Sequence, residues 1–129
     1  MGAMPGPISG IFRRADRVAA SAGSTARLQV EQRGREINAS LIELGISDAL
    51  LSAAEVPELG AKVSITLTIP GRYIEFALPG MVSWHRDGQF GVSFDYLSSR
   101  QTYGLVLSMD LMRNAANAAA HALARVAQR

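Results

Sequence analysis

Residues 62–69 read KVSITLTI, and this alternation decides the class of fold. Val63, Ile65 and Leu67 point to one side of an extended chain, while the serine and threonines between them point to the other. β-Branched residues also favour strands over helices. The segment therefore predicts a β-strand with one buried face.

The chain before this strand predicts a hairpin. Apolar residues alternate over 25–30, Arg33 and Gly34 supply a tight turn, and a second extended run covers 37–44. A break at 45–48 is followed by the short apolar stretch 49–51.

The chain after it continues in the same way. Strands are expected over 73–78, 81–85 and 90–94, with an interruption at Pro79-Gly80 and a hairpin turn at Asp87-Gly88. With 25–30, 37–44 and 62–69 this makes six short strands with closely spaced turns. Such a pattern is typical of an antiparallel barrel or sandwich, so the fold is expected to be mainly β, built from residues 24–97.

The period changes after Ser98 and Ser99, which form a helix N-cap signal. Apolar residues then follow at spacings of four and three, as in a heptad seam: Leu105, Met109, Met112, Ala116, Ala119, Leu123 and Val126. The first half of this long C-terminal helix can pack on the barrel. Residues 113–128 extend about 24 Å further and need another partner.

Alanine-rich stripes let helices approach closely, so the sequence favours a homo-oligomer joined through this association segment, residues 113–129. Two alternatives remain open. The segment is a marginal exposed helix, or it is held by a larger partner.

Composition narrows the class of protein further. The chain has 129 residues, which suits one domain, and 48% of them are hydrophobic, which excludes wholesale disorder. No apolar run approaches the roughly twenty residues of a membrane span. The absence of cysteine fits a reducing compartment, so the cytoplasm is expected. We interpret residues 1–10 as a disordered cloning remnant outside the domain.

Nothing in the sequence indicates an enzyme or a cofactor. His85 and His121 have no carboxylate or second histidine at a metal-ligand spacing. The net charge of +2 does not indicate a nucleic-acid groove, and the chain has only one tryptophan, three tyrosines and four phenylalanines for a stacking platform.

The arginines ahead of the first strand are the clearest polar cluster. Arg13 and Arg17 stand four residues apart, with Arg14 beside them. Two guanidinium groups at this spacing could converge on one anion, such as a phosphate, or on the edge of guanine. A solvated surface cluster is the alternative.

The sequence resembles the PilZ domain family over residues 11–112. The resemblance rests on RxxxR at Arg13 to Arg17, on Ile69-Pro70-Gly71, and on residues 82–85 (VSWH) leading to 91–94 (GVSF). It implies a bacterial six-stranded barrel that binds the second messenger cyclic di-GMP. It also implies that Arg13 and Arg17 contact the phosphates and guanine bases of that ligand.

The second motif of the family, [D/N]xSxxG, is where this chain departs. In the preferred alignment Glu43, Gly45 and Asp48 fill its positions; an alternative placement begins at Asn38-Ala39-Ser40 and falls in mid-strand. Gly45 offers no hydroxyl, and Asp48 adds a negative charge near the phosphates. Glu43 and Asp48 could instead pair with Arg13 or Arg17 and fill the site.

Two functions follow as hypotheses. The first is a cyclic di-GMP-responsive signalling module that acts through a protein partner. The second is a ligand-free PilZ-like adaptor that works by protein association through its barrel and C-terminal helix.

Overall fold

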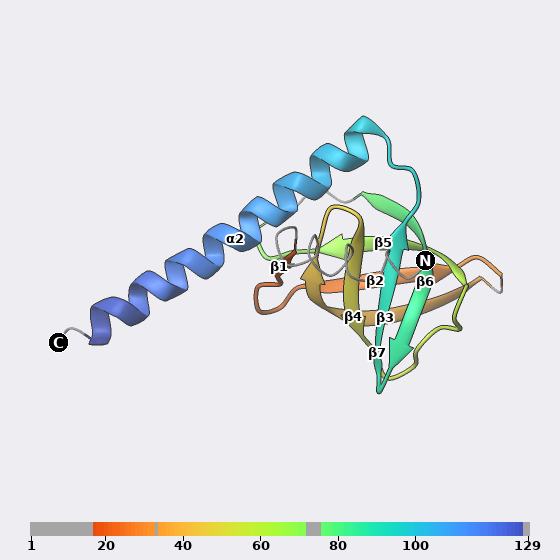
Figure 1. Ribbon diagram of the computed structural model, residues 1–129, viewed down its shortest axis with the longest axis horizontal. Helices are drawn as coiled ribbons and strands as arrows, with labels where there is room; N and C mark the ends of the chain where they lie inside the picture. The colour runs from red at the N-terminus through yellow and green to blue at the C-terminus, as the bar shows by residue number, and fades with distance from the viewer. Residues whose placement is uncertain (1–16, 33, 72–75, 128–129) are drawn as a thin grey trace, which may run out of the picture.

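The computed structural model describes residues 17–32, 34–71 and 76–127 as seven strands followed by one helix. The strands are β1 (Val18–Ala19), β2 (Thr25–Val30), β3 (Arg35–Leu44), β4 (Asp48–Ser52), β5 (Lys62–Thr68), β6 (Ala77–Arg86) and β7 (Gln89–Phe94), and helix α2 (Ser99–Ala127) follows them (Figure 1). The expectation of a disordered cloning remnant at residues 1–10 lies outside the described residues.

Six of the strands close into an antiparallel barrel, as predicted. The sheet runs β1-β3-β2-β5-β6-β7-β4, and an additional pairing between β3 and β4 closes it. Strand β1 stands outside this ring and pairs with the end of β3. Closure leaves the barrel with one interior, which becomes the core.

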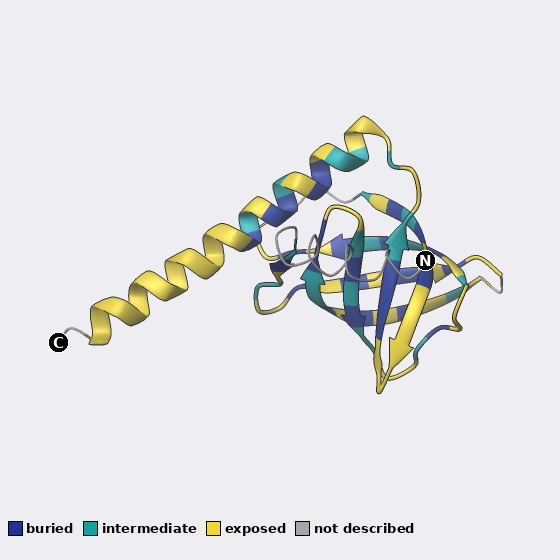
Figure 2. Ribbon diagram, viewed as in Figure 1, coloured by how far each residue is buried: buried dark blue, intermediate teal, exposed yellow. Residues whose placement is uncertain are grey.

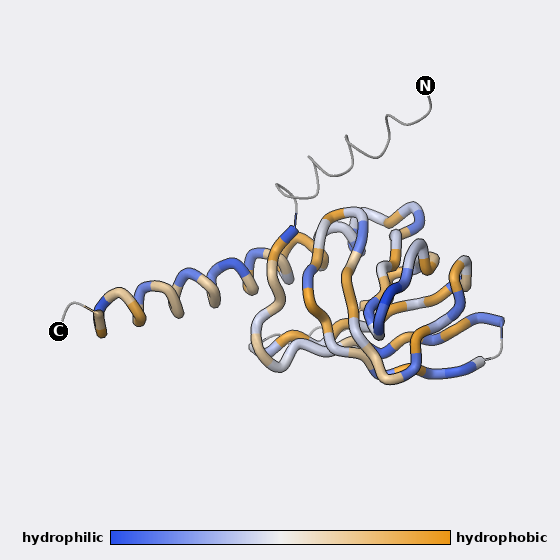
Figure 3. Tube along the Cα trace, turned by 60° about the horizontal axis from the view of Figure 1, so that its bottom comes forward, coloured by the Kyte–Doolittle hydropathy of each residue, from blue (hydrophilic) through white to orange (hydrophobic). Residues whose placement is uncertain are grey.

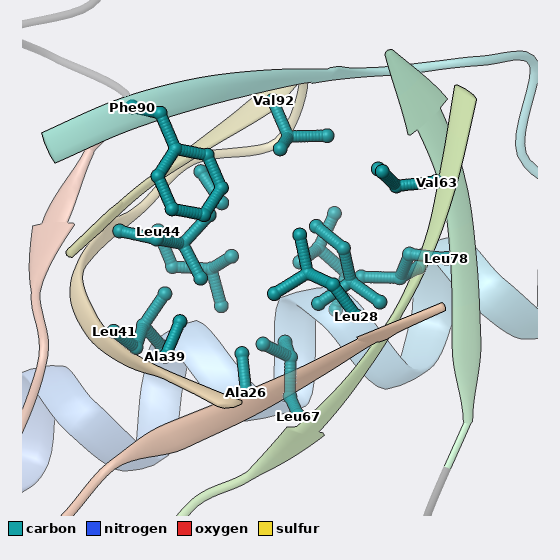
Figure 4. Packing of buried hydrophobic residues seen from close by; sticks show 14 of the residues in the cluster. Ala26, Leu28, Ala39, Leu41, Leu44, Val63, Leu67, Leu78, Phe90 and Val92 are labelled. Atoms are coloured by element: carbon teal, nitrogen blue, oxygen red, sulfur yellow. The ribbon is translucent and has the colours of Figure 1, made fainter. Parts of the chain in front are cut away.

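The predicted strand at 62–69 has the predicted buried face. In β5 the side chains of Val63, Ile65 and Leu67 are buried, and those between them face outward. The same alternation recurs in β2 and β3 (Figure 2). Figure 4 shows the resulting core, in which labelled residues of β2, β3, β5, β6 and β7 point into the barrel. Ala49 and Leu51 of β4 belong to the same buried cluster.

Strand β3 contains a β-bulge at Ile42, where its register to β4 shifts between Leu41 and Glu43. The extra residue lets Leu41 and Leu44 both enter the core although they are three residues apart. Ile42 and Glu43 therefore both face outward.

The predicted interruption at Pro79-Gly80 is wrong, because both residues lie inside the continuous strand β6. The Pro79 carbonyl accepts a hydrogen bond from the Asp95 N–H at 2.8 Å, just past the end of β7. The N–H and the C=O of one strand residue point toward the same neighbouring strand. The position where Pro79 lacks an N–H therefore faces the end of β7, where the hydrogen bonds between β6 and β7 stop.

Two strand expectations change as a consequence. The runs 73–78 and 81–85 were predicted as separate strands; the part from Ala77 onward belongs to β6, and residues 73–75 lie outside the described residues. The sixth barrel strand is instead β4, which contains the short apolar stretch 49–51.

Helix α2 begins at the predicted cap. The Gln101 N–H donates to Ser98 Oγ at 3.1 Å, and the Ser98 N–H donates to Gln101 Oε1 at 2.8 Å, which together form a reciprocal capping box. Gly104 allows the Phe76 ring to lie close to the helix, since a Cβ at residue 104 would lie 3.1 Å from Phe76 Cε1.

The seam of α2 divides into two halves. Leu105, Met109 and Met112 are buried against the barrel, and we call these three residues the seat of α2. All residues from 113 to 127 are exposed. This second half of the helix, with the rest of the seam, projects away from the barrel (Figure 2). Figure 3 shows apolar and hydrophilic residues alternating turn by turn along this exposed half. Among the described residues, no helix is long and apolar enough to cross a membrane.

Candidate functional site

Arg17 stands immediately before β1, at the end of the barrel where β3 turns into β4. Val18 pairs with Leu44 and Ala19 pairs with Glu43, so β1 is anchored to the last residues of β3. The Val18 side chain is buried in the core. This arrangement places the Arg17 side chain over the β3–β4 turn.

The Arg17 guanidinium is held by two carboxylates from neighbouring strands. Its Nη1 lies 3.3 Å from Glu43 Oε1, and its Nη2 pairs with Asp48 Oδ2. The side chains of Arg17 and Asp48 are only 16% and 22% exposed, against 40% for Glu43. We call Arg17, Glu43 and Asp48 the clasp.

The bulge in β3 contributes to this geometry. It sets Glu43 on the outer surface beside the first residue of β4, Asp48, so that both carboxylates reach one guanidinium. Arg17 Nε is buried and has no hydrogen-bond partner within the part of the chain that the structure describes. The clasp therefore uses the two terminal nitrogens of Arg17 and leaves the third unused.

Gly45 is the residue that lets Asp48 fold back over the turn. The Gly45 N–H donates to the Asp48 carbonyl at 2.8 Å. A Cβ at residue 45 would lie 3.1 Å from Asp48 Oδ1 and 3.2 Å from Arg17 Cγ. A side chain at residue 45 would therefore be in tight contact with the clasp, and Asp48 and Arg17 would have to shift by a few tenths of an ångström to admit it.

The structure brings together four of the six predicted ligand-binding residues: Arg17, Glu43, Gly45 and Asp48. The remaining two, Arg13 and Arg14, lie outside the described residues. The alternative placement of the second motif puts Asn38 opposite Arg27 in the middle of β3. The residues of the preferred alignment are the ones that lie beside Arg17.

The clasp has a net negative charge, since one guanidinium faces two carboxylates. An anion that approaches Arg17 must compete with both of them. No cluster of three or more His, Asp or Glu side chains within the described ranges could hold a metal ion. His85 and His121 are both exposed, on β6 and α2 respectively.

One element near the site was not predicted. Strand β1 has only two residues, and its pairing with β3 spans more than twenty positions of sequence. A segment this short carries no periodicity, so sequence reasoning had no signal for it. Helix α2 packs against this strand.

The class of protein follows from a closed six-stranded barrel with an arginine placed over the turn between two of its strands. The family model described as "PilZ domain" matches residues 12–107, and the chain belongs to the PilZ domain family. No curated protein sequence matches the chain.

Solved structures show the same fold. The PilZ domain of Escherichia coli YcgR, described with c-di-GMP, superposes with a TM-score of 0.68 at 12% identity, over 81% of this chain and 94% of that one. The PilZ domain of CeSA from a cellulose-synthesizing bacterium gives 0.60 at 13% identity, over 75% and 97%. The Legionella protein Lpg0364 gives 0.52 at 14% identity, over 78% and 97%.

Proposed function

We propose that this PilZ domain is an adaptor that works by protein association and does not depend on a nucleotide ligand. The clasp is the observation that carries the proposal. Glu43 and Asp48 stand where the family motif has an acid or amide and a glycine, and both hold Arg17. In this proposal the chain's own carboxylates take the place of an anionic ligand.

The energetics favour the closed clasp. To bind a phosphate, Arg17 would give up its contact with Asp48, worth roughly 1.5–3 kcal/mol, and its more exposed contact with Glu43, worth less than about 1 kcal/mol. It would also leave Glu43 and Asp48 unpaired beside the negative charge of the ligand. The family serine that could compensate is replaced by Gly45, and a serine Cβ there would be in tight contact with Asp48. Any gain from a cyclic dinucleotide must therefore exceed these losses.

The exposed half of α2 is the association surface in this proposal. Its seam residues Ala116, Ala119, Leu123 and Val126 continue the stripe that the barrel covers at Leu105, Met109 and Met112. The large members are open to solvent, with Leu123 71% and Val126 67% exposed. The small alanines between them allow the close approach of a second helix, and we assign that helix to a second copy of this chain.

Titration calorimetry with cyclic di-GMP tests the ligand-free part of the proposal. We expect no heat from the native chain with ligand at about tens of micromolar, a range that covers Kd values of signalling relevance. Binding in that range would overturn the adaptor proposal.

The proposal also assigns no catalytic residue and no cofactor, and it assumes that the module lies in the bacterial cytoplasm.

A cyclic di-GMP-responsive module is the second candidate. Two observations favour it: the family match begins at residue 12 and so includes Arg13, and a domain of the same fold is described with c-di-GMP. In this case the ligand displaces both carboxylates. Calorimetric binding that is lost in both Arg13→Ala and Arg17→Ala would establish it.

A further inference from the structure

Strand β1 is the structural link between the clasp and helix α2. On one side β1 follows Arg17 directly, and its Ala19 pairs with Glu43. The strand is therefore connected to two residues of the clasp through the backbone. On the other side α2 packs across it (Figure 1). Val18 belongs to the same buried cluster as Met109 and Met112 of the helix seat.

By itself β1 is a weak element. It has two residues and one neighbouring strand, because it lies at the end of the sheet order. One further backbone bond, from the Ala20 N–H to the Ile42 carbonyl at 2.8 Å, extends its pairing. Short segments with few backbone bonds open at low free energy. The ion pairs of Arg17 therefore add to the burial of Val18 in holding β1 on β3.

The first turns of α2 are held independently of β1. Gln101 Nε2 donates to the Ala77 carbonyl at 2.9 Å, and Gly104 lies against the Phe76 ring. Met109 and Met112 lie beyond these anchors and are still buried, at 7% and 1% exposure. The middle of the helix, beyond these anchors, is the part that passes beside β1 (Figure 1).

We infer that the clasp and the seat of α2 are coupled through β1. When Glu43 and Asp48 release Arg17, β1 loosens on β3, and Met109 and Met112 lose part of the surface that covers them. The exposed half of the helix, residues 113–127, then changes its direction relative to the barrel. The coupling is a property of the chain itself and holds whether or not a nucleotide is the agent that opens the clasp.

Coupling of this kind is reciprocal. If opening the clasp unseats the helix, then weakening the seat must also loosen β1 while the clasp residues remain intact. A partner that binds residues 113–127 and displaces the helix would likewise weaken the contacts of Arg17 with Glu43 and Asp48.

Nuclear magnetic resonance on the full chain tests the inference at both ends of the link. Exchange of the Ala20 amide reports on β1, and relaxation of the Met109 and Met112 methyl groups by a soluble gadolinium chelate reports on the seat. In the double variant Glu43→Gln with Asp48→Asn we expect Ala20 to exchange about tenfold faster or more, the factor that the loss of one charge-assisted hydrogen bond gives. The two seat methyl groups become more accessible in the same variant, while that of Met81 on β6 does not change.

A matched control removes an ion pair at a different part of the barrel. Glu55→Gln breaks the contact between Arg35 Nη1 and Glu55 Oε2, which is 2.9 Å long, and should alter neither Ala20 exchange nor the seat. Faster exchange at Ala20 with unchanged Met109 and Met112 methyl groups would overturn the coupling.

The reverse experiment covers the case in which the double variant unfolds. Met112→Ala weakens the seat and leaves the clasp untouched, and it should accelerate exchange at Ala20. Val106→Ala, on the exposed side of the same helix, should not. If Ala20 exchanges at the native rate in Met112→Ala, the inference is wrong.

Discussion

Gly45 and Asp48 share one volume at the turn between β3 and β4. The backbone N–H of Gly45 donates to the Asp48 carbonyl at 2.8 Å, and a Cβ at residue 45 would lie 3.1 Å from the Asp48 carboxylate. The two departures from the family motif are therefore in contact: the absence of a side chain at 45 leaves room for the Asp48 carboxylate, which holds Arg17.

Gly45→Ser should destabilise the domain. The added side chain meets both Asp48 and Arg17 Cγ, and overpacking of this kind costs about 1–3 kcal/mol. Urea denaturation measures the loss, and Ala54→Ser, at an exposed loop position, is the control. Adding Asp48→Gly to Gly45→Ser should recover part of the stability. Additive losses from the two substitutions would show that the residues do not share a volume.

The two carboxylates of the clasp should contribute unequally to stability. Asp48 is less exposed than Glu43, so its contact with Arg17 is less screened by water. Asp48→Asn is expected to lower the free energy of unfolding by about 1.5–3 kcal/mol, and Glu43→Gln by less than about 1 kcal/mol. Equal losses, or a larger one at Glu43, would contradict the geometry.

Trp84 provides an optical test of the barrel wall. Its indole lies flat on Gly91 of the neighbouring strand, so that a Cβ at residue 91 would come within 2.3 Å of Nε1. Gly91→Ala should displace the ring, cost about 1–3 kcal/mol, and shift the emission of the single tryptophan. Ser93→Ala, in the same strand, should leave the emission unchanged. A native-like spectrum in Gly91→Ala would mean that the ring does not rest on this residue.

Association through α2 should depend on one face of the helix. Multi-angle light scattering of the native chain is expected to show a dimer or larger assembly, and Ala119→Glu should reduce it to a monomer because a charge enters the apolar seam. Asn117→Glu adds the same charge on a different face and should have no effect. The helix would not be the contact surface if both variants remained assembled, or if the native chain were monomeric.

Much of the fold follows from periodicity in the sequence. The alternation at 62–69 and the seam from Leu105 onward are local patterns, and both specify the element and its buried face. The parts that were missed depend on distant partners. Pro79-Gly80 reads as a break because proline usually ends a strand, and only the end of β7 shows why a proline fits there.

The site was predictable only as a set of residues. The family pattern singled out Arg17, Glu43, Gly45 and Asp48, and pairing between the arginines and the two acids was one of the stated options. Which arginine pairs, and through which atoms, depends on β1 and on the bulge at Ile42, and neither has a local sequence signal. The spatial role of Gly45 required the positions of Asp48 and Arg17.

The helix seam runs without interruption from the barrel into solvent, and this fixes the rotational phase of its exposed half. The barrel holds the seat residues Leu105, Met109 and Met112 in place. It is therefore the barrel, and not a second copy of the chain, that sets the direction in which Ala119 and Leu123 face. One residue inserted between Met112 and Ala116 would turn the outer stripe by about 100° and lift it by about 1.5 Å. The apolar stripe of residues 116–126 would be intact, yet the two barrels of the proposed assembly would be oriented differently relative to each other. In the proposed assembly, the length of this short segment therefore determines, together with its composition, how the two copies are oriented.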